Sequence, residues 1–103
     1  MSIPSLSVLQ ILILDTLGVA EVQSAVLRDK LKLAGFKKSA PAFYQAMSRL
    51  EDAGLVESRY TKRVLHGHTV KEKHFKVTGD GVEAMREAKQ FFDGLNWGDE
   101  SYA

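Results

Sequence analysis

The sequence contains no cysteine among its 103 residues. This absence excludes disulfide bonds, thiolate metal sites and a cysteine nucleophile, and it favours an intracellular, cytoplasmic protein. Long hydrophobic runs are also missing: the most apolar stretch, residues 6–17, is shorter than the roughly 20 residues that a membrane span needs. It is interrupted by Ser7, Gln10, Asp15 and Thr16, and it lacks the basic segment of a signal peptide. We therefore expect no contact with a membrane.

Motifs of catalysis are scarce as well. The chain has no glycine-rich phosphate loop and no nucleophile beside an evident base and orienting group, so we predict neither an enzyme nor a bound cofactor. A metal site is an alternative use of His66, His68 and His74, which a hairpin would bring near one another. Only Glu72 could add a carboxylate ligand to these histidines. Since histidines in a basic turn are usually solvated, we predict no metal ion.

Positive charge is concentrated in one segment. The net charge is +1, yet residues 55–78 carry six Lys or Arg against two Asp or Glu, a local charge of +4. Residues 79–103 carry two basic against six acidic residues, a local charge of −4. The length fits one compact domain, and no internal repeat, linker or low-complexity segment divides it. A polyanionic partner is therefore expected to bind the middle segment.

Residues 39–54 are predicted to form the helix around which the domain is organised. Ser39 is a candidate N-cap, Pro41 lies in the first turn, and Gly54 follows the last turn. The face that packs in the core is indicated by three apolar residues at helical spacing: Phe43, Met47 and Leu50. The opposite face carries side chains that can hydrogen-bond to a phosphate or a base edge: Tyr44, Gln45, Ser48 and Arg49.

Two further helices are predicted before this one. The first extends from Pro4 or Ser5 to Leu17 and the second from residue 21 to residue 34, and a glycine follows each. The buried stripe of the second helix is expected to contain Val22, Ala25, Val26 and Leu33. A short connection through Lys37 and Lys38 leads into the third helix, which indicates a helix-turn-helix pair.

The period of the pattern changes from about 3.6 to about 2 after Leu55. Two strands are predicted between residues 55 and 78, joined near His66-Gly67-His68, where Gly67 can adopt the positive φ of a tight turn. Both strands carry basic side chains: Arg59, Lys62, Arg63, Lys71, Lys73 and Lys76. A basic hairpin that follows a helix with such a polar face is typical of a wing.

A final helix is predicted from Gly79 or Asp80 to about Asp93, with Thr78 as its cap. Its aromatic end exposes more apolar surface than one terminal helix readily buries, and the first helix is apolar around much of its circumference. We predict a homodimer interface made by Leu12, Val82, Met85, Phe91, Phe92, Leu95 and Trp97. The alternative is that the last helix folds back on the first. A small-molecule effector of unknown chemistry is a further candidate partner for these apolar surfaces.

Several short motifs stand in a characteristic order. Phe43-Tyr44, Arg49-Leu50-Glu51 and Gly54-Leu55-Val56 follow one another, and Lys73-His74-Phe75-Lys76-Val77-Thr78 precedes Gly81. In order and spacing these motifs resemble those of PadR-like transcriptional regulators. Two positions depart from that family's pattern, since Val19-Ala20-Glu21-Val22 replaces a His-Gly-Tyr motif and Gln45 stands where proline is common. The resemblance implies a repressor-like DNA-binding protein that forms a homodimer through its terminal helices.

Together these features predict an α+β, mainly α fold: a winged helix-turn-helix of three helices, a two-stranded basic wing and one C-terminal helix. Residues 1–78 would form the DNA-binding domain, and residues 79–103 the dimerisation helix and tail of the same compact unit. The predicted function is sequence-specific regulation of transcription, as a repressor, by a homodimer on double-stranded DNA.

The helix at residues 39–54 is expected in the major groove, and the wing on the backbone or in the minor groove. The predicted DNA-binding residues are Lys37, Lys38, Ser39, Ala42, Tyr44, Gln45, Ser48, Arg49, Lys62, Arg63, Lys71 and Lys73. The alternative function is that of a docking module whose basic wing binds an acidic protein.

Overall fold

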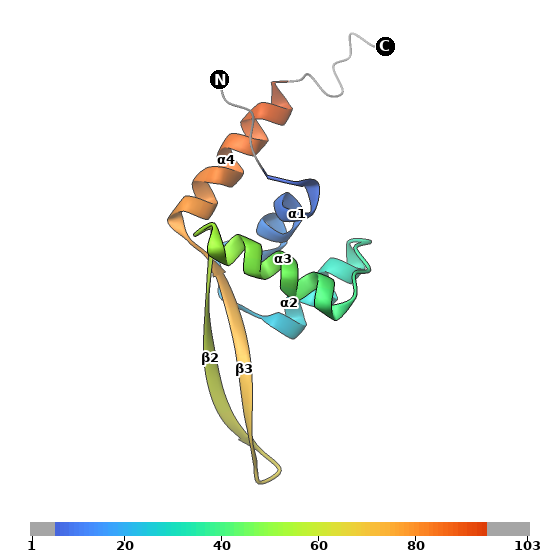
Figure 1. The fold of residues 1–103 in the computed structure, drawn as a ribbon, viewed down its shortest axis with the longest axis vertical. Helices are drawn as coiled ribbons and strands as arrows, with labels where there is room; N and C mark the ends of the chain where they lie inside the picture. Colours follow the sequence, from blue (N-terminus) through green and yellow to red (C-terminus); the bar gives the residue numbers. More distant parts are fainter. Residues whose placement is uncertain (1–5, 95–103) are drawn as a thin grey trace.

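The computed structural model describes residues 6–94, which form a helical body with a long hairpin projecting from it (Figure 1). The helices are α1 (Val8–Leu17), α2 (Ser24–Leu33), α3 (Ala40–Asp52) and α4 (Gly79–Asp93). The strands are β1 (Val22–Gln23), β2 (Val56–Leu65) and β3 (His68–Val77), in an antiparallel sheet of order β1-β3-β2. The predicted winged helix-turn-helix is confirmed, with one strand more than expected. None of the described helices is both long and apolar enough to cross a bilayer.

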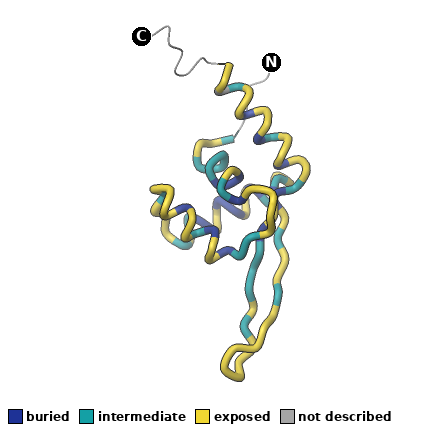
Figure 2. The backbone as a smooth tube through the Cα atoms, turned by 180° about the vertical axis from the view of Figure 1, so that it is seen from behind, coloured by how far each residue is buried: buried dark blue, intermediate teal, exposed yellow. Residues whose placement is uncertain are grey.

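The hydrophobic core lies where the helices meet the base of the hairpin. Its largest fully buried side chains come from α1, α2, α3 and both long strands: Ile13, Leu27, Met47, Leu50, Val56 and Phe75. The buried stripe predicted for α3 is confirmed, since Phe43, Met47 and Leu50 are all buried. Burial falls away along the hairpin, and its outer part is exposed (Figure 2). The outer hairpin therefore adds little to the core and leaves its side chains available to a partner.

α1 begins later than predicted, because Ser7 caps it. The Ser7 Oγ accepts a hydrogen bond from the Gln10 amide at 3.1 Å, and the Ser7 amide donates to Gln10 Oε1 at 2.9 Å. This reciprocal capping box fixes the first turn at Val8. The predicted start at Pro4 or Ser5, residues outside the described range, is therefore wrong. The helix ends at residue 17, as predicted.

α2 also begins later than predicted, because the residues ahead of it join the sheet. Val22 and Gln23 form β1, which pairs with β3. The helix then buries a different set of side chains: Ser24, Leu27 and Leu31. The predicted stripe is wrong, since Val26 and Leu33 are 42% and 89% exposed. With Val22 held in the sheet, the helix turns Leu27 and Leu31, which are four residues apart, toward the core.

A two-residue turn joins β2 to β3 at the tip of the hairpin. Leu65 pairs with His68, so His66 and Gly67 are the turn residues. Both have positive φ, 51° and 79° respectively, as a type I′ turn requires. The prediction for Gly67 is confirmed, whereas His66 was not expected there because side chains other than glycine rarely adopt this region. This turn sets the register of the whole hairpin.

The chain enters α4 through a close contact with the start of β2. The predicted cap is confirmed: Thr78 Oγ1 accepts from the Gly81 amide at 3.0 Å and donates to the Gly54 carbonyl at 2.6 Å. Gly81 packs against the backbone so closely that a Cβ atom there would overlap the Leu55 carbonyl oxygen and lie 2.6 Å from Val77 Cγ1. A side chain at position 81 would therefore push α4 away from the sheet.

We expect Gly81→Ala to lower the free energy of unfolding by about 2 kcal/mol, the usual cost of forcing extra atoms into packed structure. The clash outweighs the gain of up to about 1 kcal/mol that alanine brings to a helix. Urea denaturation followed by circular dichroism measures the change. Gly79→Ala is the matched control, because a Cβ at Gly79 meets nothing within 4 Å and should leave stability unchanged or higher. Equal midpoints for the two variants would contradict this account of Gly81.

Candidate nucleic-acid interface

α3 presents its polar face to solvent. Its predicted contact residues Tyr44, Gln45, Ser48 and Arg49 are all exposed, and Ala42 is half-buried. The residues that lead into the helix, Lys37, Lys38 and Ser39, are exposed too, and the Ser39 Oγ accepts from the Ala42 amide at 3.3 Å as the predicted N-cap. Side chains that can contact phosphates and base edges therefore extend without a break from the turn onto the helix.

Contacts on both sides hold α3 in place. At its last turn, Glu51 Oε2 accepts a hydrogen bond of 2.6 Å from the Ser58 hydroxyl of β2. In its first turns, the Tyr44 ring packs edge-on against Phe43 with centroids 5.0 Å apart, and the Tyr44 hydroxyl lies 3.4 Å from Ser24 Oγ of α2. Glu51 thus makes its contact within the domain, and Tyr44 stands at a fixed place beside the hairpin.

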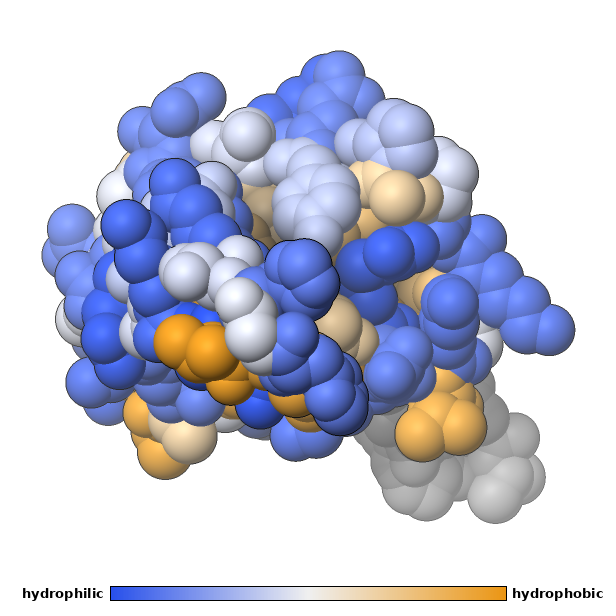
Figure 3. Space-filling model, turned by 90° about the horizontal axis from the view of Figure 1, so that it is seen from below, coloured by the Kyte–Doolittle hydropathy of each residue, from blue (hydrophilic) through white to orange (hydrophobic). Residues whose placement is uncertain are grey.

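The hairpin register divides the wing into two faces of different character. Tyr60 pairs with Lys73 and Lys62 with Lys71, and alternation along each strand puts all four side chains on the same face. We call this outer surface the lysine face: Tyr60, Lys62, Val64, Thr69, Lys71 and Lys73. It continues the side of the sheet on which Val56 and Phe75 pack into the core, so it lies on the same side as the helices. Viewed from the hairpin end, the molecule is mostly hydrophilic (Figure 3).

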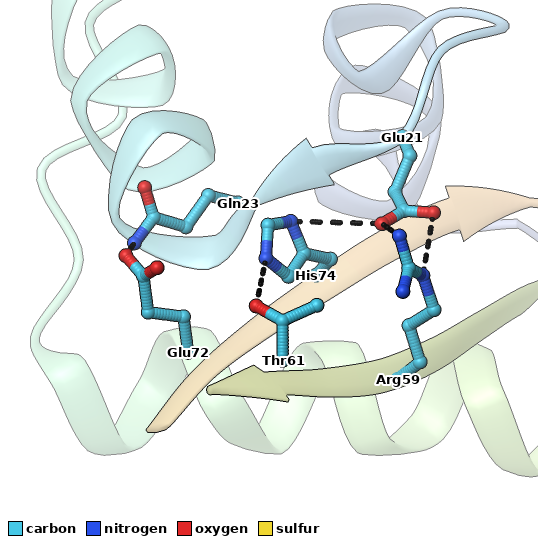
Figure 4. A network of polar contacts seen from close by, with 6 residues as sticks. All are labelled: Glu21, Gln23, Arg59, Thr61, Glu72 and His74. Carbon is cyan, nitrogen blue, oxygen red and sulfur yellow. Dashed lines mark hydrogen bonds and ion pairs between the residues drawn. The ribbon is translucent and has the colours of Figure 1, made fainter. Parts of the chain in front are cut away.

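The opposite surface, the ion-pair face, contains Glu57, Arg59, Thr61, Arg63, Glu72, His74 and Lys76. Both acidic residues of the hairpin belong to it. Arg63 Nε lies 3.2 Å from Glu72 Oε1. The side-chain amide of Gln23 in β1 donates a hydrogen bond to the other Glu72 oxygen (Figure 4). The structure therefore does not bring Arg63 together with the three lysines predicted beside it, because strand alternation turns it to the opposite face, where it pairs with Glu72.

A second cluster on the ion-pair face joins the wing to the segment before β1. Glu21 binds Arg59 through two contacts, 2.9 Å from Nε and 2.8 Å from Nη2. His74 lies between them and Thr61, with Nδ1 3.6 Å from Glu21 and Nε2 2.9 Å from the Thr61 hydroxyl (Figure 4). The hydrogen bond from Arg59 holds the pKa of Glu21 below its usual value, and Glu21 raises the pKa of Arg59. These contacts fix the direction in which the wing leaves the body.

No family model and no curated protein matches this sequence. Solved structures do match it. A PadR-like transcription factor from Bacteroides fragilis is 23% identical over 85% of this chain and 82% of its own, with a TM-score of 0.71. A PadR family transcriptional regulator from Eggerthella lenta is 25% identical over 84% of this chain and 73% of its own, with a TM-score of 0.69. The fold of this chain is PadR-like.

A third match is PadR of Bacillus subtilis, solved in complex with operator DNA. It is 23% identical over 78% of the present chain, with a TM-score of 0.64, and the matched part is 45% of its own length. The PadR-like motifs have plain structural reasons in this chain. Leu50 fills the core, Glu51 binds Ser58, and Gly81 allows α4 to meet the sheet.

The PadR-like fold also brings forward residues that the sequence did not single out. Tyr60 is one of them. An aromatic residue in a strand usually packs in the core, yet Tyr60 is 54% exposed beside Lys71 and Lys73. Arg28 and Lys32 of α2 line a shallow groove with Lys38 beside the start of α3. Arg28 and Lys32 are four residues apart, which places them on one face of a helix. The predicted buried stripe of α2 gave no reason to single out that face.

The three histidines do not gather in this PadR-like chain. His66 and His68 lie at the hairpin tip, while His74 is six residues further along β3, roughly 20 Å away at about 3.3 Å per residue. The expectation that the hairpin would bring His74 near the others is wrong, because the turn residues are 66 and 67. Within residues 6–94, no group of three or more potential ligands is placed to hold a metal ion.

The residues predicted for a dimer interface are divided between core and surface. Met85 is buried in the core of its own chain, Leu12 and Phe91 are half-buried, and the Val82 side chain is 40% exposed. An apolar groove of about 390 Å³ lies between α1 and α4 and includes Leu14, Val82 and Met85 in its lining. The Phe92 side chain, Leu95 and Trp97 lie outside the described part of this PadR-like chain.

We expect Glu21→Gln to lower the thermal midpoint at pH 7, since it removes the charge that binds Arg59. The pKa of Glu21 is lowered in the folded chain, so its stabilising effect is present above its ordinary value of 4.5 and is lost as the pH falls through the lowered pKa. The midpoints of the wild type and variant should therefore converge in acid. Glu83→Gln is the control, because the ion pair of Glu83 with Arg86 lies within α4 and does not involve the wing. A difference that persists unchanged in acid would contradict this role of Glu21.

Proposed function

We propose that this PadR-like protein is a DNA-binding regulator of transcription that acts as a homodimeric repressor. The observation that carries the proposal is the lysine face, which continues from the side of the sheet that packs on α3, next to that helix's exposed polar residues. The three lysines on it, Lys62, Lys71 and Lys73, form a sequence-independent contact surface for phosphates. PadR of Bacillus subtilis, which has a similar fold, was solved with operator DNA bound.

The proposed contacts divide by chemistry. Gln45 and Ser48, with Ala42 beside them, face base edges in the major groove, because amide and hydroxyl groups read donor and acceptor patterns there. Tyr44, Arg49 and the residues leading into α3, Lys37, Lys38 and Ser39, contact the backbone. The lysine face contacts the backbone next to the same groove, while Arg63 stays with Glu72 on the opposite face. Neutralisation of Arg63 makes it the weakest of the predicted contacts.

We expect Lys62→Ala to reduce the slope of log affinity against log salt by about one, because one phosphate contact is lost. The measurement is binding to a duplex that the wild type selects from a randomised pool, titrated over a range of salt concentrations. Arg63→Ala is the matched control on the other face and should change the slope much less. An equal loss of slope in both variants would contradict the assignment of the DNA contact to the lysine face.

Gln45→Ala should act on sequence preference instead. Losing a base contact costs about 1–3 kcal/mol on the preferred base pair, and the salt slope should stay that of the wild type. Selection from the same randomised pool, compared between wild type and variant, measures the change at each position. If the wild type binds no duplex even at low salt, the DNA-binding proposal fails, and a docking module for an acidic protein takes its place.

The homodimer is proposed to form through α1 and α4, where apolar surface such as Val82 remains exposed. We expect a light-scattering mass of two chains for the wild type and of one chain for Val82→Asp, because a buried unpaired carboxylate is costly. Leu33→Asp is the control, since Leu33 is 89% exposed at the far end of α2 and its substitution should leave the mass unchanged. A wild-type mass of one chain would overturn the dimer.

A further inference from the structure

A cleft separates the wing from the helical body, with a volume of about 460 Å³. The body contributes Gln23, Ser24 and Tyr44, and the hairpin contributes Tyr60, Val70, Lys71, Glu72 and Lys73. Tyr44 belongs to α3, the candidate recognition helix, so a residue of that helix and residues of the lysine face line the same cleft. A ligand seated there would touch α3 and the wing at once.

The Tyr60 ring holds two ammonium groups on the hairpin side of this cleft. Lys71 Nζ lies 4.2 Å from the ring centroid, and Lys73 Nζ lies 5.4 Å from it and 5.2 Å from the centroid of Phe75. Each cation is attracted to the electron-rich ring face, which restrains two flexible side chains in one region despite their mutual repulsion. Tyr60 is directly opposite Lys73 in the register, so the arrangement follows from the hairpin itself.

Negative charge next to the two lysines is already engaged. Glu72 lines the cleft, but one of its oxygens accepts from Gln23 and the other lies 3.2 Å from Arg63. On the opposite wall the Tyr44 hydroxyl lies 3.4 Å from Ser24 Oγ, which keeps it at the cleft. Two cations and a hydroxyl thus surround the same space, a combination that suits the non-bridging oxygens of one phosphate group.

We propose that this cleft receives a single backbone phosphate of the bound DNA, with Lys71 and Lys73 binding its oxygens and Tyr44 donating a hydrogen bond. Tyr60 is a positioning residue that acts through the two lysines. The inference rests on the proposed DNA-binding function and deepens it, because the same phosphate would fix the wing relative to the recognition helix. An isolated carboxylate of an acidic protein is the competing ligand that the experiment distinguishes.

The first test separates the Tyr60 ring from its hydroxyl. Using the duplex that the wild type selects from a randomised pool, Tyr60→Leu should weaken binding about fivefold, since two exposed cation–π contacts are lost. Tyr60→Phe keeps the ring and should bind within about twofold of the wild type. Tyr60 lies outside the core with its side chain 54% exposed, so both variants are expected to fold. Equal affinities of Tyr60→Leu and the wild type would overturn its positioning role.

The second test locates the phosphate. Single phosphates of the same duplex are replaced in turn by neutral methylphosphonates, and one position should weaken wild-type binding about tenfold, as loss of charged hydrogen bonds does. At that position the replacement should cost Lys71→Ala no more than about twofold, because the contact is already gone. Lys76→Ala, which removes an exposed cation of the opposite face four residues along β3 from Glu72, should keep the full tenfold sensitivity.

The outcomes separate the inference from the proposed function. If the wild type binds no duplex, and an acidic peptide binds in a manner that depends on Lys71, the proposed function and the phosphate site fail together. If the wild type binds duplex DNA but Lys71→Ala shows the same methylphosphonate sensitivity as the wild type at every position, the phosphate site alone is overturned. If a single methylphosphonate position weakens wild-type binding and has little effect on Lys71→Ala, the phosphate site is supported.

Discussion

The cross-strand register of the hairpin is the constraint on which the candidate interface depends. His66 and Gly67 occupy the two turn positions with positive φ, and this fixes Leu65 opposite His68 and every pair behind them. A shift of β3 by one residue would turn its side chains over, placing Glu72 on the face where Lys71 now lies. The pairing of Val56 with Val77 at the core end opposes such a shift, because both side chains are buried. The turn and the core thus specify the same register from opposite ends.

The ion-pair face has a mechanical role that complements the lysine face. β1 has only two residues. Glu21, which precedes it, binds Arg59 of the hairpin, and Gln23, its second residue, binds Glu72. Backbone pairing of Val22 with Phe75 holds the same segment to the sheet. Since α2 begins at the next residue, Ser24, this short segment joins the wing to the helix-turn-helix a second time, beside the direct connection from α3 to β2. From Ser24 the contacts continue to α3, because the Ser24 hydroxyl lies 3.4 Å from that of Tyr44.

The positions of α3, α4 and the hairpin turn could be predicted from neighbouring residues, whereas the pairing of distant segments could not. Ser39 and Thr78 cap their helices by contacts three residues away, so the signals lie within one helical turn. β1 has two residues, and its partner Phe75 is more than fifty positions away, which no local pattern records. Because β1 was not predicted, the predicted second helix began too early and its buried face was assigned to the wrong residues. Separating Arg63 from the lysines of the wing, and finding Tyr60 among them, required the register.

The charge distribution argues for a directed encounter with a polyanion. A net charge of +1 gives weak long-range attraction, so orientation depends on where the charges lie. The wing and α4 project from opposite ends of the helical body (Figure 1), and the described part of α4 carries Asp80, Glu83, Glu87 and Asp93 against Arg86 and Lys89. This distribution would repel a polyanion from α4 and attract it to the wing. Pairing of Arg59 and Arg63 with carboxylates leaves the lysine face as the more positive side of the wing, so in the proposed complex this face would orient α3 toward the groove before any base is contacted.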